Sequence, residues 1–271
     1  MTSVHSRLSV SGLCFPEMSA EEAVRACGEL GVLWTSITSA KASATGAGVL
    51  AAAARESGVG VATTTAAIRF DLAPGADNSD RVSAALADVD QAAALGATTV
   101  YTLTGPRVFD TWSENAEAYA ALAAPVVAHA GAKGVRVALE PTNWLYADLT
   151  FVHSFRDAVA LATLAGMGVC LDLFHVWTEA DLLENIAEHI DLIHHVQVSD
   201  MERGARSLPC RTVPGDGDIP LRSLVAHLLA AGYTGPFDLE LSGPRIDESG
   251  HRAAVLTSLA RLESLLDDLG A

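Results

Sequence analysis

Short runs in which apolar and polar residues alternate recur along the second half of the chain. In VRVALEPTN, residues 135–143, every second residue up to Leu139 is Val or Leu, and the other face ends at Glu140. Pro141 follows and cannot donate to a sheet ladder. Alternation with a period of two is typical of a β-strand that packs one face against helices. We therefore expect a strand here that carries Glu140 at its carboxyl end.

The same plan recurs in three later runs. GVCLD ends at Asp172, LIHHVQVS carries Gln197, and FDLELS carries Glu240, each on the face opposite to the strand's packing residues. By this parity, Glu140 and these three residues point away from the helices, near the carboxyl ends of their strands. Four oxygen-bearing groups that converge at one edge of a sheet predict a divalent-cation site.

Strands and helices alternate along the whole chain. The predicted strands are 8–14, 32–36, 60–64, 98–102, the run that ends at Glu140, 168–172, 192–199 and 237–241. Helices are predicted from Ser19, which forms a capping-box pattern with Glu22, to about Gly28 or Gly31, and over 46–57, 80–95, 113–133, 154–164, 179–189, 221–231 and 250–269. Residues 1–271 contain no break in composition that resembles a linker. Eight strand-plus-helix units in this length predict a single α/β domain, a (β/α)8 TIM barrel.

Two common nucleotide-binding motifs are missing from the sequence. No GxGxxG follows the first predicted strand, and GxxxxGK[ST] does not occur. Dinucleotide-binding and P-loop functions therefore lose their main support. In a barrel, chemistry is expected at the carboxyl ends of the strands, where the four acceptors converge.

Charge and composition indicate which classes of partner the protein can bind. The formal net charge is −16, and no run rich in Lys or Arg occurs, so the field would repel nucleic acid. No uninterrupted apolar stretch reaches membrane-spanning length, and the N-terminus lacks the apolar core of a signal peptide. The four cysteines have no CxxC spacing, which predicts reduced thiols. We expect a cytoplasmic protein that acts on a small molecule, without a nucleic-acid or membrane partner.

Four pieces of sequence resemble the xylose isomerase-like barrel superfamily of sugar isomerases and epimerases: ALEPTN, LDLFH, HVQVSD followed by VPGDGDIPL, and GYTGPFDLE. The resemblance implies that Glu140, Asp172 and Glu240 bind a divalent metal. The fourth ligand of the family is usually a histidine, and Gln197 stands there, as in hydroxypyruvate isomerases. A set of oxygen donors favours Mn²⁺ or Mg²⁺, with Co²⁺ and Fe²⁺ as further candidates.

The resemblance also indicates residues that contact substrate. His175 matches the family's DxxH histidine, and Arg203 stands six residues after Gln197, where the epimerases place an arginine. Arg211, shortly before PGDG, competes with Arg203 for that role. The remaining candidates for the pocket wall are Asn143, Trp144 and Phe174. His194 and His195 are expected to be structural.

The chemistry that the resemblance implies is removal of a proton next to a carbonyl and its return elsewhere, with Glu140 and Glu240 as base and acid. The leading prediction is a metal-dependent isomerase or epimerase of a small ketose or related hydroxycarbonyl compound, which proceeds through an enediolate. The alternative is a lyase on the same site, like inosose or dehydroshikimate dehydratases. An endonuclease for abasic DNA and a non-catalytic sugar-binding barrel remain as lesser alternatives. Dimers or tetramers are common among such barrels.

Overall fold

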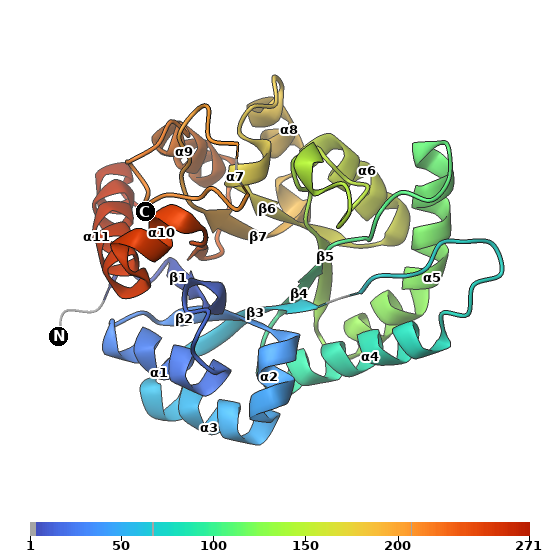
Figure 1. Cartoon of the computed structure of the whole chain (residues 1–271), viewed down its shortest axis with the longest axis horizontal. Helices are drawn as coiled ribbons and strands as arrows, with labels where there is room; N and C mark the ends of the chain where they lie inside the picture. The colour runs from blue at the N-terminus through green and yellow to red at the C-terminus, as the bar shows by residue number, and fades with distance from the viewer. Residues whose placement is uncertain (1–3, 67, 207) are drawn as a thin grey trace.

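Eight parallel strands close into a barrel in the computed structural model, which describes residues 4–66, 68–206 and 208–271. Each strand pairs with its neighbours in sequence, and β8 pairs with β1 (Figure 1). The strands are β1 Leu8–Ser11, β2 Trp34–Thr38, β3 Gly60–Ala66, β4 Thr99–Thr102, β5 Arg136–Leu139, β6 Gly168–Asp172, β7 Ile193–Val198 and β8 Phe237–Leu239. The predicted TIM barrel is confirmed.

Helices surround the strands (Figure 1). The α-helices are α1 Ala20–Glu29, α2 Ser39–Thr45, α3 Ala47–Ser57, α4 Ser79–Ala94, α5 Trp112–Ala132, α6 Phe155–Ala165, α7 Leu173–Val176, α8 Leu182–Glu188, α9 Leu221–Ala231, α10 Pro244–Ser249 and α11 His251–Leu269. Three short 3-10 helices are η1 Gly12–Cys14, η2 Trp144–Tyr146 and η3 Ile190–Leu192. Each of the eight predicted helices is present, with bounds that shift by a few residues. The short helices α2, α7 and α10 were not predicted.

Local hydrogen bonds explain where the prediction differs. The first predicted strand was to reach residue 14, but the chain turns at Ser11, whose hydroxyl accepts from the amide of Leu13 at 3.2 Å. Helix α7 begins directly after β6, because the carboxylate of Asp172 accepts from the amide of Phe174 at 3.0 Å. One helical turn is too short to produce a readable hydrophobic period.

The two faces of the strands serve different purposes. Outward side chains join the apolar core between barrel and helices, while the interior holds a small cluster of Tyr101, Ala138 and Cys170. Deeper inside, the carboxylate of Asp238 accepts hydrogen bonds from buried partners: the hydroxyls of Ser9 and Ser36 and the ring of His195. Because buried polar groups need partners, this network fixes the lower layer of the interior beneath the candidate site.

The described part of the chain holds no helix that is both long and apolar enough to cross a membrane.

Candidate active site

The four predicted oxygen donors meet at the carboxyl end of the barrel. Asp172 ends β6 and pairs in register with Gln197 of β7. Glu140 and Glu240 lie one residue beyond β5 and β8, where their amides still donate to Thr102 and Val198 of the neighbouring strands, at 3.0 and 3.1 Å. All four side chains are buried, so the parity read from the sequence places them together as expected.

Arg211 lies among these acids. One guanidinium nitrogen donates to Asp172 at 2.6 Å and to Glu240 at 2.8 Å, and another donates to the hydroxyl of Ser199 at 2.8 Å. The guanidinium also covers the ring of Phe174, 4.4 Å from its centroid. Arg211 comes from the long loop between β7 and α9, and only 4% of its surface is exposed.

His175 lies on the other side of the acids. Its Nε2 lies 3.7 Å from a carboxylate oxygen of both Glu140 and Asp172. Its Nδ1 accepts from the amide N–H of Asn143 at 3.3 Å and lies 3.2 Å from the side-chain nitrogen of the same residue. Asn143 therefore touches His175, and Tyr146 packs edge-on against the same imidazole.

Gln197 directs its amide nitrogen, not its oxygen, toward the acids. The nitrogen donates to Glu240 and to the hydroxyl of Tyr101, the latter at 3.1 Å, while the thiol of Cys170 donates to the amide oxygen at 3.1 Å. In this arrangement Gln197 holds Glu240. Ligation of a metal by its oxygen stays a prediction.

Burial and like charges oppose full ionisation of the site. Burial, with repulsion from Glu240 and Asp172, raises the pKa of Glu140 well above its usual value. Burial also raises the pKa of Glu240 to about 7, although Arg211 opposes this shift. For Asp172, burial is outweighed by Arg211, His175 and hydrogen bonds, which lower its pKa. Burial lowers the pKa of His175 to about 4, so this imidazole is neutral at pH 7.

The donor set fits a divalent cation. Ligand atoms of Glu140, Asp172 and His175 lie within 4.8 Å of one another, and all three residues are buried. Three ionised carboxylates beside the single guanidinium of Arg211 would carry a formal charge of −2 in a dry environment. Since buried charge is costly without compensation, a divalent ion is the group that this cluster can best accommodate.

One predicted substrate contact, Arg203, lies elsewhere. The side chain of Arg203 is 76% exposed and pairs with Asp218 at 2.8 Å, so the structure brings Arg211 and not Arg203 to the acids. Trp144 directly follows Asn143 and is 72% exposed, and its contact with substrate stays a prediction. As expected, His195 has structural contacts: its ring bonds Asp238 and Thr63 inside the barrel.

Sequence reasoning missed two residues at the site, Ser199 and Tyr101. Ser199 bonds Arg211, and it shares the inward parity of Gln197, a signal that could have revealed it. Tyr101 points inward from β4 and bonds Gln197. Strand β4 is only four residues long, and an alternating pattern over such a length does not by itself show that Tyr101 makes a polar contact.

A curated relative shares sequence with part of the chain. A 3-dehydroshikimate dehydratase of Pseudomonas putida is 31% identical in an alignment of 134 residues that covers 46% of this chain. The chain spans only 20% of the length of that relative.

Solved structures share the fold over nearly the whole chain. Protein SMc04130 from Sinorhizobium meliloti 1021 is 26% identical, with a TM-score of 0.82 and coverage of 96% of this chain and 98% of that one. An L-ribulose 3-epimerase matches with 18% identity, a TM-score of 0.82 and coverage of 98% and 96%. The IolI protein, solved with a bound zinc atom, matches with 16% identity, a TM-score of 0.83 and coverage of 97% and 99%. At these last two identities the likeness shows the fold alone.

A family model matches residues 21–265, which include every strand from β2 to β8 and the whole acidic cluster. The chain therefore belongs to the xylose isomerase-like TIM barrel family.

Proposed function

We propose that the protein is a divalent-metal-dependent isomerase or epimerase that acts on a small ketose or related hydroxycarbonyl compound. The observation that carries the proposal is the buried cluster of Glu140, Asp172, His175 and Glu240 at the catalytic end of the barrel. Glu140 and Glu240 follow strands β5 and β8, which are not neighbours in the barrel. Two carboxylates can thus reach a bound substrate from different directions.

The proposed chemistry uses this separation. A divalent cation held by the carboxylates of Glu140, Asp172 and Glu240, Mn²⁺ or Mg²⁺ in our proposal, would polarise the substrate carbonyl and stabilise charge on its oxygen. One of the two glutamates removes the proton from the carbon next to the carbonyl, and the other returns a proton to the neighbouring carbon or to the opposite face. Arg211 and the neutral His175 offer N–H donors that can orient the substrate oxygens.

A second candidate is a lyase at the same site. The specific observation in its favour is the sequence match to a 3-dehydroshikimate dehydratase. Such a reaction begins with the same proton removal and continues with loss of a β-hydroxyl as water. The acidic cluster serves both reactions, so only the product separates them.

One experiment tests both candidates. The protein is loaded with Mn²⁺ and incubated in D₂O with L-ribulose, other small ketoses and 3-dehydroshikimate, and each mixture is analysed by NMR. We expect deuterium at the carbon next to the carbonyl, and at least a ~100-fold slower exchange in Glu140→Gln and Glu240→Gln. Recovered isomer or epimer supports the first candidate, and an unsaturated product one water lighter supports the second. Absence of both exchange and a new product with every compound would contradict both.

A further inference from the structure

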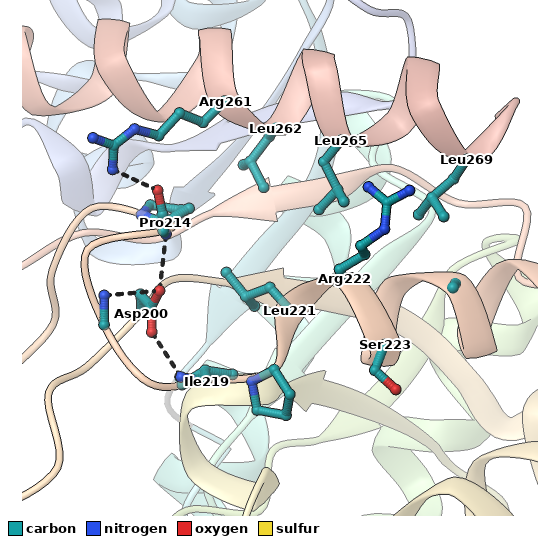
Figure 2. A pocket seen from close by; sticks show the side chains of 14 residues that line it. Asp200, Pro214, Ile219, Leu221, Arg222, Ser223, Arg261, Leu262, Leu265 and Leu269 are labelled. Carbon is teal, nitrogen blue, oxygen red and sulfur yellow. Dashed lines mark hydrogen bonds between the residues drawn. The ribbon is translucent and has the colours of Figure 1, made fainter.

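Asp200, two residues after β7, is buried and bonds four backbone amides. One carboxylate oxygen accepts from Met201 at 2.9 Å and from Ile219 at 3.0 Å, and the other accepts from Gly215 at 2.9 Å and Gly217 at 3.2 Å. Only 1% of the residue is exposed. Figure 2 shows this carboxylate inside the curve of the loop that leads to Ile219. Four backbone amides from different parts of the loop thus bond this one side chain, so Asp200 ties the start of the loop to its end.

The end of the loop lies between a cavity and Asp200. Pro214, Gly215, Gly217 and Ile219 border a cavity of about 1000 Å³ between α9 and α11, whose other walls include Leu262 and Leu265 (Figure 2). On its inner side the loop lies tight against Asp200: a Cβ at Gly217 would lie 2.3 Å from the Asp200 carboxylate. One side of the loop thus borders the cavity, where Arg261 donates to the carbonyl of Pro214 at 2.9 Å, and the other side lies against this acid.

The same residue fixes the backbone beside Arg211. The backbones of Asp200 and Thr212 form an antiparallel bridge, with two N–H···O bonds at 3.1 and 2.7 Å. The Asp200 side chain holds the segment that follows this bridge, through the amides of residues 215, 217 and 219. Thr212 follows Arg211 directly, so the bridge sets where the Arg211 side chain starts. From there the guanidinium reaches Asp172 and Glu240.

We propose that Asp200 is a positioning residue that acts through Arg211. By fastening the loop at both ends, it keeps the guanidinium between Asp172 and Glu240. The inference rests on the proposed function in one respect, that these acids also hold a divalent cation. A guanidinium bonded to two of the acids opposes a metal ion there by like-charge repulsion, so release of Arg211 makes the acids more available to the metal.

The test compares four proteins: the parent, Asp200→Asn, Arg211→Met and the double variant. The dissociation constant for Mn²⁺ is measured by calorimetry at fixed pH and salt. We expect Arg211→Met to bind Mn²⁺ about tenfold more tightly or better, because a positive charge leaves the site. Asp200→Asn replaces two acceptor oxygens by one oxygen and an NH₂ group, loses at least two of the four bonds and should bind several-fold more tightly. In the Arg211→Met background, Asp200→Asn should add nothing.

Asp216→Asn is the matched control. Asp216 lies in the same loop and carries the same charge, but it pairs with Arg261 at 2.7 Å, away from the acids. Its loss should leave Mn²⁺ affinity unchanged or slightly weaker, since one negative charge disappears. If Asp200→Asn does not fold, Gly217→Ala takes its place, because the added Cβ displaces the Asp200 carboxylate, together with the carbonyl of Met201, without removing a charge.

Two outcomes would overturn the proposal. The first is an Mn²⁺ affinity of Asp200→Asn that is unchanged or weaker than that of the parent. The second is an equal effect of Asp200→Asn on Mn²⁺ affinity in the parent and in Arg211→Met. If none of the four proteins binds Mn²⁺, the metal-dependent function fails and the thermal midpoints decide about Asp200. If Asp200→Asn lowers the thermal midpoint less in the Arg211→Met protein than in the parent, the result still supports action through Arg211. If the midpoint shifts of the two single variants add up to that of the double variant, Asp200 stabilises its loop but does not act through Arg211.

Discussion

Arg211 donates to Asp172 over 2.6 Å in a part of the barrel where neither side chain has appreciable access to solvent. Although burial opposes its charge, Asp172 and Glu240 raise the pKa of Arg211 above its usual value. The guanidinium is therefore a permanent charge at the site. It compensates part of the acidic cluster and leaves the rest for a divalent ion.

Replacing Arg211 by Met should destabilise the metal-free protein strongly. Breaking a buried pair leaves its partner uncompensated, which costs about 3–5 kcal/mol of unfolding free energy. Urea denaturation in the presence of a chelator measures the loss, and Mn²⁺ should restore part of it. Arg203→Met is the control: Arg203 pairs with Asp218 at the exposed surface, so its loss should lower the free energy of unfolding far less than the loss of Arg211 does. Equal effects of the two changes would contradict the buried pairing.

Binding of Mn²⁺ should stabilise the folded protein. An ion present at ~100 times its dissociation constant adds about 2.7 kcal/mol to the free energy of unfolding, because the unfolded chain lacks the assembled site. Thermal denaturation with and without Mn²⁺ measures the gain, and Glu140→Gln should abolish most of it. Glu184→Gln, an exposed position on α8, should keep the full gain. A gain that survives in Glu140→Gln would place the ion elsewhere.

The barrel could be predicted because its strands and helices are locally consistent. The capping box of Ser19 and Glu22 was read from the sequence and both of its hydrogen bonds are present. Strict alternation of strands and helices leaves few topologies. The short helices that could not be predicted depend on single hydrogen bonds. Helix α7, for example, starts where the side chain of Asp172 caps it. A one-turn helix contributes no periodicity.

Parity placed the acids of the site correctly, but it could not orient their neighbours. A strand position fixes the direction of Gln197, whereas Tyr101 and Cys170, distant in sequence, decide which end of its amide faces Glu240. For the same reason, the sequence could not show whether Arg203 or Arg211 contacts the acids. Both lie in one long loop, and the side-chain contacts in the folded protein decide which arginine turns inward: Arg211 reaches the acids, and Arg203 pairs with Asp218.

Glu179 should make stability depend on pH. Its carboxylate accepts from the amide of Phe155 at 2.8 Å, and burial, with the nearby Asp157 and Asp181, raises its pKa from 4.5 to about 7. An acid whose pKa is raised in the folded state binds a proton that the unfolded chain has already released. The unfolding free energy should therefore fall as pH rises from about 4.5 to about 7.

Urea denaturation at several pH values measures this dependence. Glu179→Gln keeps an acceptor for Phe155 but cannot ionise, so the fall attributed to Glu179 should disappear. Glu117→Gln changes the same charge at an exposed position of α5 and should follow the parent. If Glu179→Gln shows the same slope as the parent, another group is responsible.

Asn143 should select the tautomer of His175. The Asn143 side-chain oxygen accepts from the amide of Leu145 at 3.1 Å, which turns its NH₂ group toward Nδ1 of His175. The Asn143 backbone N–H points at the same atom, so two donors face Nδ1. With burial lowering the pKa of His175 to about 4, the neutral ring must carry its hydrogen on Nε2, toward Glu140 and Asp172.

Nitrogen-15 NMR of the histidine rings distinguishes the two tautomers, and His175→Gln identifies the signals of His175. At pH 7 we expect a bare Nδ1 and a protonated Nε2. In Asn143→Asp, a carboxylate replaces the donor and should draw the hydrogen to Nδ1, while His195, which bonds Thr63 inside the barrel, should keep its signals. A protonated Nδ1 in the parent would contradict the assignment. It would also give His175 a free lone pair toward the acids, and so make it a metal ligand in place of a hydrogen-bond donor to substrate.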